Sequence, residues 1–69
     1  MTDVPIKGII RLGQFLQVAG LIDTGADAKS VIADGVVLVN GDVELRRGRQ
    51  LQAGDVVELS GRDARVVAG

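Results

Sequence analysis

The sequence contains no cysteine and no histidine, and Phe15 is its only aromatic residue. Without cysteine, neither a disulfide nor a thiolate metal site can stabilise the chain. Without histidine, the commonest general base and the commonest neutral metal ligand are missing. One aromatic side chain cannot supply the several stacking platforms that single-stranded nucleic-acid modules use. These absences predict a non-catalytic protein with no metal and no cofactor, which would bind any nucleic acid through charge and shape.

Long apolar runs are also missing. No stretch reaches the 18 or so apolar residues of a membrane span, and the start, Met1-Thr2-Asp3, lacks the basic and apolar regions of a signal peptide. The chain of 69 residues is long enough for one small domain, and its 46% hydrophobic content is ordinary for a globular protein. We therefore expect a single domain over residues 1–69, cytoplasmic and without membrane contact.

Positive charge is not in excess, since eight basic residues face nine acidic ones and the formal net charge is -1. Taken as a total, this balance argues against a nucleic-acid binder. The distribution of the basic residues along the chain modifies that conclusion. Three of the eight basic side chains, Arg46, Arg47 and Arg49, fall within four positions around Gly48.

Two helices are predicted in the first half of the chain. Over residues 9–19, apolar residues recur with the i, i+3, i+4, i+7 spacing of an amphipathic helix, at Leu12, Phe15, Leu16 and Ala19. Gly20 is the expected stop of this helix. A second helix is predicted over residues 25–34, with Asp23 or Thr24 as its N-terminal cap and Gly35 as its left-handed C-terminal cap.

After Gly35 the pattern changes to that of strands. Residues 36–39 form a β-branched run, and Asn40-Gly41 predicts a type I′ hairpin turn. Residues 42–45 alternate polar and apolar side chains, which predicts a strand with one buried face. Residues 56–59 and 64–68 complete a predicted antiparallel sheet, and Asp55 is expected to make an Asx-type turn bond. The order of elements indicates an α+β fold.

Residues 11–59 resemble the S4 RNA-binding domain, and within that family they resemble most the small stand-alone bacterial S4-like proteins. The residues that carry the likeness are Leu12, Phe15-Leu16, Gly20-Leu21, Ala28-Lys29, Ile32, Gly35, Val37-Leu38-Val39-Asn40-Gly41 and Gly54-Asp55-Val56-Val57. The resemblance implies an αL motif, in which two helices pack against a small antiparallel sheet, with the core motif at about residues 9–59. It also implies that RNA is held along the helices and the adjoining loop.

The basic residues are the candidates for such binding. Guanidinium groups bind phosphate oxygens in a bidentate way, and a glycine lets the backbone approach a phosphate closely. The candidate RNA-binding residues are Lys7, Arg11, Lys29, Arg46, Arg47, Gly48 and Arg49. Each also has a structural alternative. The loop arginines could pair with Asp42 or Glu44, and Lys29 could pair with Asp27 or Asp34.

The sequence departs from the family pattern at two places on the expected RNA-binding surface. Many S4 domains carry an aspartate after Arg-Leu and further arginines at the start of the second helix, whereas this chain has Gly13 and then Thr24-Gly25-Ala26-Asp27. The second helix still offers free N–H groups at its N-terminus, and Gly25 leaves them accessible to a phosphate.

No serine, lysine or carboxylate has the spacing of a catalytic or metal-binding site. The sequence therefore predicts a small RNA-binding protein that recognises structured RNA, ribosomal or transfer, by shape and phosphate contact. The alternative is a protein-interaction module with an S4-like fold that docks on a ribosome-associated or RNA-modification partner, which the acidic charge balance favours. In either case we expect a monomer.

Overall fold

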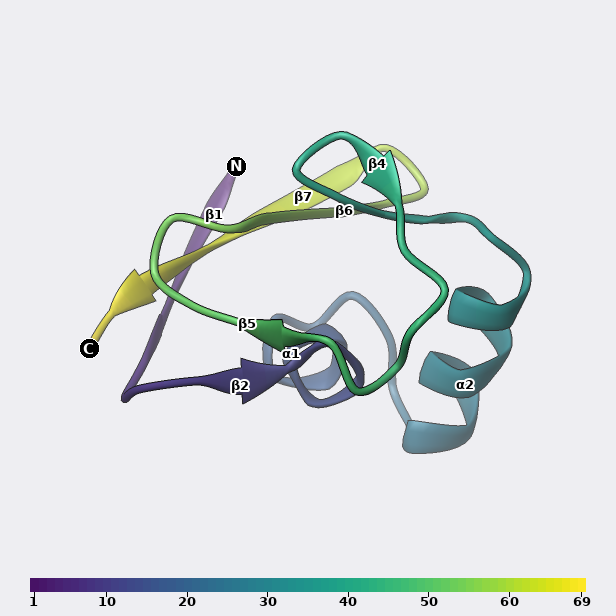
Figure 1. Ribbon diagram of the computed structural model, residues 1–69, viewed down its shortest axis with the longest axis horizontal. Coiled ribbons are helices and arrows are strands. Elements are labelled where there is room, and N and C mark those ends of the chain that lie inside the picture. The colour runs from purple at the N-terminus through teal and green to yellow at the C-terminus, as the bar shows by residue number, and fades with distance from the viewer.

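A five-stranded sheet forms one layer of the molecule, and both helices lie on the same side of it (Figure 1). The computed structural model describes all of residues 1–69. The strand order is β1 (Thr2–Ile6), β7 (Arg62–Ala68), β6 (Val56–Leu59), β3 (Val37–Val39) and β4 (Asp42–Val43). The fold is α+β, as predicted. The sheet is mixed rather than antiparallel, because β1 and β7 pair in parallel.

Strand β1 was not predicted from the sequence. It pairs with β7 over its whole length, and Val4, opposite Val66, is buried. Pro5 lies within this strand, and proline is tolerated in a sheet mainly on an edge strand, where one side of the backbone needs no partner. The expectation of an entirely antiparallel sheet was wrong because this edge pairing joins the two ends of the chain.

A second, small sheet lies beneath the first and leads into the first helix. Strand β2 (Ile10–Arg11) pairs antiparallel with β5 (Gln50–Leu51), and α1 (Leu12–Val18) follows β2 directly. The predicted helix start at residue 9 was therefore too early, since Ile10 and Arg11 are extended. Gly20 has φ +73° and ends the helix, as predicted.

Helix α2 (Gly25–Ala33) has the caps that the sequence predicted. The Oγ1 of Thr24 accepts a hydrogen bond of 3.1 Å from the backbone N–H of Asp27. At the other end Gly35 has φ +74°, a conformation that glycine adopts without strain. Neither helix is long and apolar enough to cross a membrane.

The turn between β3 and β4 is of the predicted kind, with φ 53° at Asn40 and 88° at Gly41. The burial of the strand after it is the reverse of the prediction. Val43 and Leu45 are 55% and 64% exposed, whereas Glu44 is 7% exposed. Strand β4 is an edge of the sheet and ends at Val43, so the alternating pattern does not place its apolar side chains in the core.

Asn40 also connects this turn to the turn that precedes β6. Its Nδ2 donates to Oδ1 of Asp55 (3.1 Å), and its Oδ1 accepts from the backbone N–H of Val56 (2.9 Å). Asp55 accepts from the backbone N–H of Gln52 (3.0 Å), three residues earlier. The predicted Asx-type bond would run forward along the chain, so that prediction was wrong in direction.

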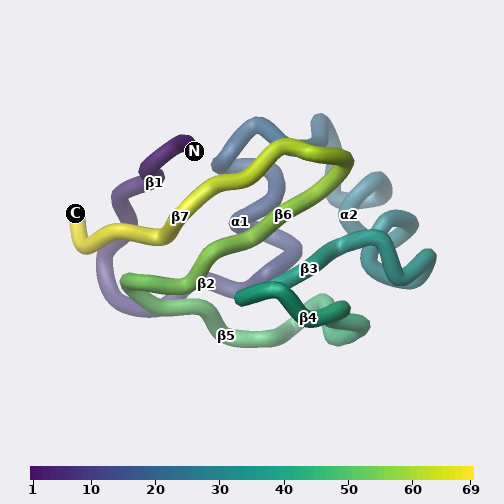
Figure 2. Tube along the Cα trace, turned by 90° about the horizontal axis from the view of Figure 1, so that it is seen from above, coloured from purple at the N-terminus to yellow at the C-terminus, as the bar shows by residue number.

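The core lies between the helices and the sheet. In the tube view from above, α1 lies behind β6 and β7 (Figure 2). It contains thirteen buried apolar residues: Val4, Leu12, Phe15, Leu16, Ala28, Ile32, Val37, Val39, Leu51, Val57, Leu59, Ala64 and Val66. The predicted apolar stripe of α1 supplies three of them. Since this face of α1 is buried, its opposite, polar face is left at the surface.

Candidate nucleic-acid interface

A groove of about 320 Å³ lies where the starts of α1 and α2 meet the loop of residues 46–49. Ala28 is the only apolar residue among the eight that line it. The lining residues are Arg11, Gly13, Gln14, Gln17, Gly25, Ala28, Arg47 and Gly48. Two guanidinium groups and no carboxylate thus belong to this groove.

The pairing of β2 with β5 brings the loop against the start of α1. The backbone N–H of Leu12 donates to the carbonyl of Arg49 (2.8 Å), and that of Gly13 donates to the carbonyl of Arg47 (3.1 Å). The loop therefore satisfies the first two N–H groups of α1. Because these two donors are occupied, they are not free to bind a phosphate.

Gly13 makes room for Arg47. A Cβ atom added at Gly13 would lie 2.8 Å from Cγ of Arg47, which is closer than atoms can pack without movement. The aliphatic part of the Arg47 side chain therefore passes directly over Gly13. The aspartate that many S4 domains have at this place would displace Arg47, so the glycine is matched to this loop.

Glu44 is the residue around which the loop is arranged. Its Oε2 accepts from the backbone N–H and Nε of Arg46 (both 3.1 Å), and its Oε1 accepts from Nη2 of Arg46 (3.2 Å) and Nη1 of Arg49 (2.9 Å). These bonds, led by the side-chain bond from Arg46, lower the pKa of Glu44 from 4.5 to about 2 against the opposing effect of burial. The same contact raises the pKa of Arg46.

The three loop arginines are therefore not equivalent. Arg46 and Arg49 form ion pairs with Glu44, which was one of the two partners considered from the sequence. Arg47 makes no side-chain hydrogen bond or ion pair and lines the groove. Arg46 still has 76% of its side chain exposed, and Arg49 has 31%.

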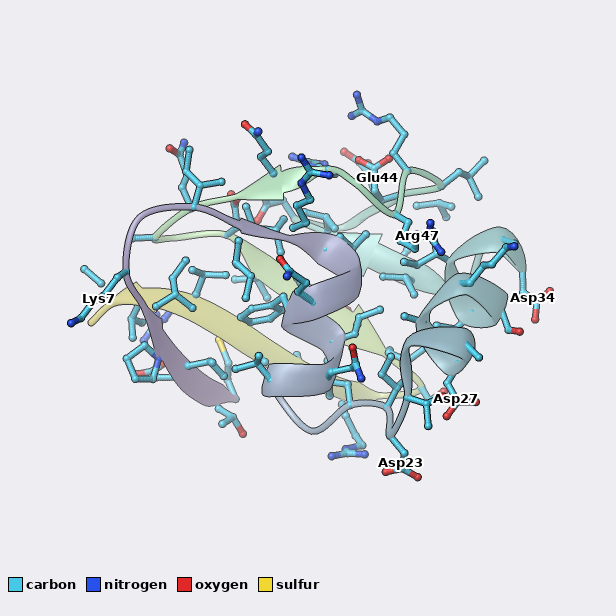
Figure 3. The ribbon with its side chains drawn as sticks, turned by 90° about the horizontal axis from the view of Figure 1, so that it is seen from below. Lys7, Asp23, Asp27, Asp34, Glu44 and Arg47 are labelled. Carbon is cyan, nitrogen blue, oxygen red and sulfur yellow. The ribbon has the colours of Figure 1, made fainter.

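The two lysines lie in different places. Lys29 is exposed on α2, four positions after Gly25, so its side chain leaves the helix about 40° around the axis from the groove residue Gly25. It pairs with neither Asp27 nor Asp34. Lys7 follows β1 and lies at the far end of the molecule from Arg47 (Figure 3). Neither lysine is among the residues that line the groove.

The start of α2 contributes backbone donors. The backbone N–H groups of Gly25 and Ala26 have no acceptor within the protein. The Oγ1 of Thr24 accepts from the N–H of Asp27, and the carbonyl of Thr24 accepts from the N–H of Ala28. Gly25 lines the groove together with Arg11 and Arg47, and its nearest side-chain neighbour is Oε1 of Gln17, 3.9 Å from where a Cβ atom would lie. The N–H of Gly25 is therefore a backbone donor beside the two arginines.

Negative charge gathers on another side of α2. A second groove, of about 380 Å³, is lined by Asp23, Asp27 and Arg62 beside five apolar residues. Figure 3 shows Asp23 and Asp27 on a different side of α2 from Arg47. Farther away, on β7, Arg65 pairs with Asp3 at 3.0 Å. The first groove contains basic side chains and no acidic ones, so the total of -1 does not describe its surface.

Gln14 and Gln17 belong to the groove and were not singled out from the sequence. They are three positions apart on α1, on the side of the helix opposite its apolar stripe, and Arg11 directly precedes the helix. That spacing was the available signal. No group of three or more acidic side chains is placed to hold a metal ion.

The S4 domain model matches residues 6–67, which is most of the chain. The protein belongs to the S4 domain family. It is 49% identical over 53 residues to RlbA of Bacillus subtilis (strain 168), which is named as a probable ribosome maturation protein, with 77% of this chain and 75% of RlbA covered. It is 39% identical over 59 residues to YbcJ of Escherichia coli (strain K12), named provisionally as an RNA-binding protein, with 86% and 84% covered.

Solved structures agree with this assignment. The solution structure of E. coli YbcJ, described as revealing an αL motif involved in RNA binding, superposes on this S4-domain chain with a TM-score of 0.70 at 34% identity, covering 97% of this chain and 85% of YbcJ. The 30S ribosomal protein S4e from Thermoplasma acidophilum gives a TM-score of 0.65 at 20% identity, covering 87% of this chain and 32% of S4e. The second likeness concerns the fold alone. The S4-like fold predicted from the sequence is confirmed.

Proposed function

We propose that this S4-domain protein binds structured RNA, and specifically ribosomal RNA, without catalysing a reaction. The observation that carries the proposal is the groove in which Arg11, Arg47 and the free N–H groups of α2 converge without any carboxylate. The relatives support the choice of ribosomal RNA, since RlbA is named as a probable ribosome maturation protein.

Each part of the groove suits one part of an RNA backbone. The forks of Arg11 and Arg47 bind phosphate oxygens, and the N–H groups at the start of α2 favour the same anion through the helix dipole. The amides of Gln14 and Gln17 can donate to and accept from a ribose 2′-hydroxyl, the group that distinguishes RNA from DNA. With one aromatic residue, buried in the core, the protein recognises RNA shape rather than stacked bases.

The number of free cations limits the affinity. Arg11, Arg47 and Lys29 would neutralise about three phosphates, and each contact contributes about 0.7–0.9 to the slope of log K against log salt. Electrostatics alone would then give weak binding that falls steeply with salt. A folded RNA that fits the surface between α1, α2 and the loop would supply the remaining affinity.

The proposal can be tested by crosslinking a tagged protein to RNA in cells and sequencing the RNA that is recovered. Ribosomal RNA should be enriched with the wild type and lost with Arg11→Ala/Arg47→Ala. The matched control is Arg62→Ala/Arg65→Ala, which removes the same charge from β7. In vitro, the first double variant should lower the salt slope by about 1.5. Equal RNA recovery with both double variants would contradict the assignment of the groove.

A second candidate function, docking on a ribosome-associated protein, is supported by the other groove. There two carboxylates, Asp23 and Asp27, and one guanidinium, Arg62, lie beside apolar side chains, and the excess of negative charge suits a basic, apolar segment of a partner protein. The two functions differ in outcome. Recovery of one protein partner without RNA, lost with Asp23→Asn/Asp27→Asn and kept with Arg11→Ala/Arg47→Ala, would favour docking over RNA binding.

A further inference from the structure

We propose that Glu44 is a positioning residue for the RNA surface. By binding Arg46 and Arg49 it fixes the turn between them, so that Arg47 extends into the groove and makes the main phosphate contact of the loop. This inference rests on the proposed RNA binding and assigns different roles to the three arginines. Arg46 and Arg49 hold the loop in place, and Arg47 contacts the RNA.

The hydrogen bonds of Glu44 reach both ends of the turn. The turn itself is closed by the backbone N–H of Arg49, which donates to the carbonyl of Arg46 (3.2 Å). One carboxylate oxygen binds the backbone and side chain of Arg46, and the other binds the side chains of Arg46 and Arg49. Arg47 and Gly48 lie between these two held residues. One buried carboxylate therefore ties the two ends of the turn together.

The rest of the protein holds the same turn from outside. The backbone N–H of Glu44 donates to the carbonyl of Val37 in β3 (3.0 Å), which fixes the carboxylate relative to the main sheet. On the α1 side, the N–H of Gly13 holds the carbonyl of Arg47. Glu44 thus links the sheet to the groove, and the Arg47 side chain passes over the one residue of α1 that has no Cβ atom to obstruct it.

Charge and position give opposite expectations for the removal of this carboxylate. If Glu44 acted on RNA only through its charge, its loss would reduce the repulsion of phosphate and strengthen binding. If it positions Arg47, its loss would weaken binding in spite of the added positive charge. The sign of the change in affinity therefore decides between the two roles.

The experiment compares Glu44→Gln with the control Asp42→Asn in titrations of a ribosomal RNA fragment recovered from the crosslinking. Each variant removes one negative charge from the same hairpin, but Asp42 is exposed and makes no side-chain hydrogen bond or ion pair. We expect Asp42→Asn to bind as well as the wild type or up to about twofold more tightly. We expect Glu44→Gln to bind about three- to tenfold more weakly. Tighter binding by Glu44→Gln would overturn the proposal.

A second pair of variants separates positioning from a general loss of structure. In a background of Arg47→Ala, the further change Glu44→Gln should cause no additional loss of affinity, because its effect passes through Arg47. The same loss in both backgrounds would overturn the proposal. Amide spectra of Glu44→Gln without RNA should show changes at Gly13 and Arg47 with the folded signals of α2 retained. Absence of RNA binding by the wild type at low salt would instead overturn the proposed function.

Discussion

Asn40 gives the sharpest test of how the short turn motifs hold the sheet together. Its side chain joins the β3–β4 turn to the turn before β6 through bonds to Asp55 and to the backbone of Val56. Its backbone has φ 53°, in the left-handed region. We therefore compare Asn40→Ala, which loses the bonds and keeps a Cβ atom, with Asn40→Gly, which loses the bonds but adopts the backbone conformation freely.

The magnitudes follow from these two features. The two side-chain hydrogen bonds contribute about 1 kcal/mol each to the free energy of unfolding, so both variants lose about 2 kcal/mol from them. A left-handed conformation costs a residue with a Cβ atom about 1 kcal/mol more than glycine, and Asn40 already bears this cost in the wild type. Asn40→Ala should therefore lose about 2 kcal/mol in total, and Asn40→Gly about 1 kcal/mol. For a domain of this size such a loss is a large part of the whole stability.

The assay is urea-induced unfolding followed by far-ultraviolet circular dichroism, because the chain has no tryptophan or tyrosine to report by fluorescence. The midpoint should fall in the order wild type, Asn40→Gly, Asn40→Ala with an unchanged slope. If both variants lose less than about 0.5 kcal/mol, the connection between the two turns does not stabilise the sheet and the reasoning is wrong. If glycine is no better than alanine, the argument from φ fails.

Two further predictions concern the groove. Gly13→Ala should weaken RNA binding by about threefold or more, measured by titration, because the added Cβ atom would displace the Arg47 side chain. The free energy of unfolding should stay nearly unchanged, because alanine favours a helix over glycine by about 1 kcal/mol and this gain offsets the cost of moving Arg47. An unaltered RNA affinity would contradict the close contact. Because the pKa of Glu44 falls from 4.5 to about 2 on folding, its stabilising contribution is complete above about pH 5 and lost as the pH falls through 2. The urea midpoint should therefore fall more steeply between pH 5 and 2 for the wild type than for Glu44→Gln. If the two midpoints fall in parallel with pH, the ion pairs of Glu44 do not stabilise the fold.

The local features of the fold could be predicted from the sequence because single residues determine them. Thr24 caps its helix with its own hydroxyl, and Gly20, Gly35 and Gly41 have the positive φ angles for which glycine is suited. The chemistry in these cases acts over three or four positions, so the sequence shows it directly.

The features that were predicted wrongly, or not at all, depend on residues that are distant in the sequence. The alternation of residues 42–45 predicted that Val43 and Leu45 are buried, but Glu44 is buried instead, because Arg46 and Arg49 satisfy its carboxylate. From the sequence, the pairing of these arginines with Glu44 was only one of two alternatives, because the sequence does not show whether Asp42 or Glu44 is their partner. The role of Gly13 is similar, because its closest neighbour is a side chain 34 positions later in the chain.

The parallel pairing of β1 with β7 also determines when the fold can be completed during synthesis. Asp3 and Arg65, which pair across these strands, are 62 positions apart. The two arginines of the groove and both helices are made well before β7, yet β1 has no partner until the last strand emerges. Contacts between such distant positions close late and slow folding. A chain interrupted before β7 would therefore carry both arginines of the groove beside an incomplete sheet, and its first strand would remain an unpaired edge.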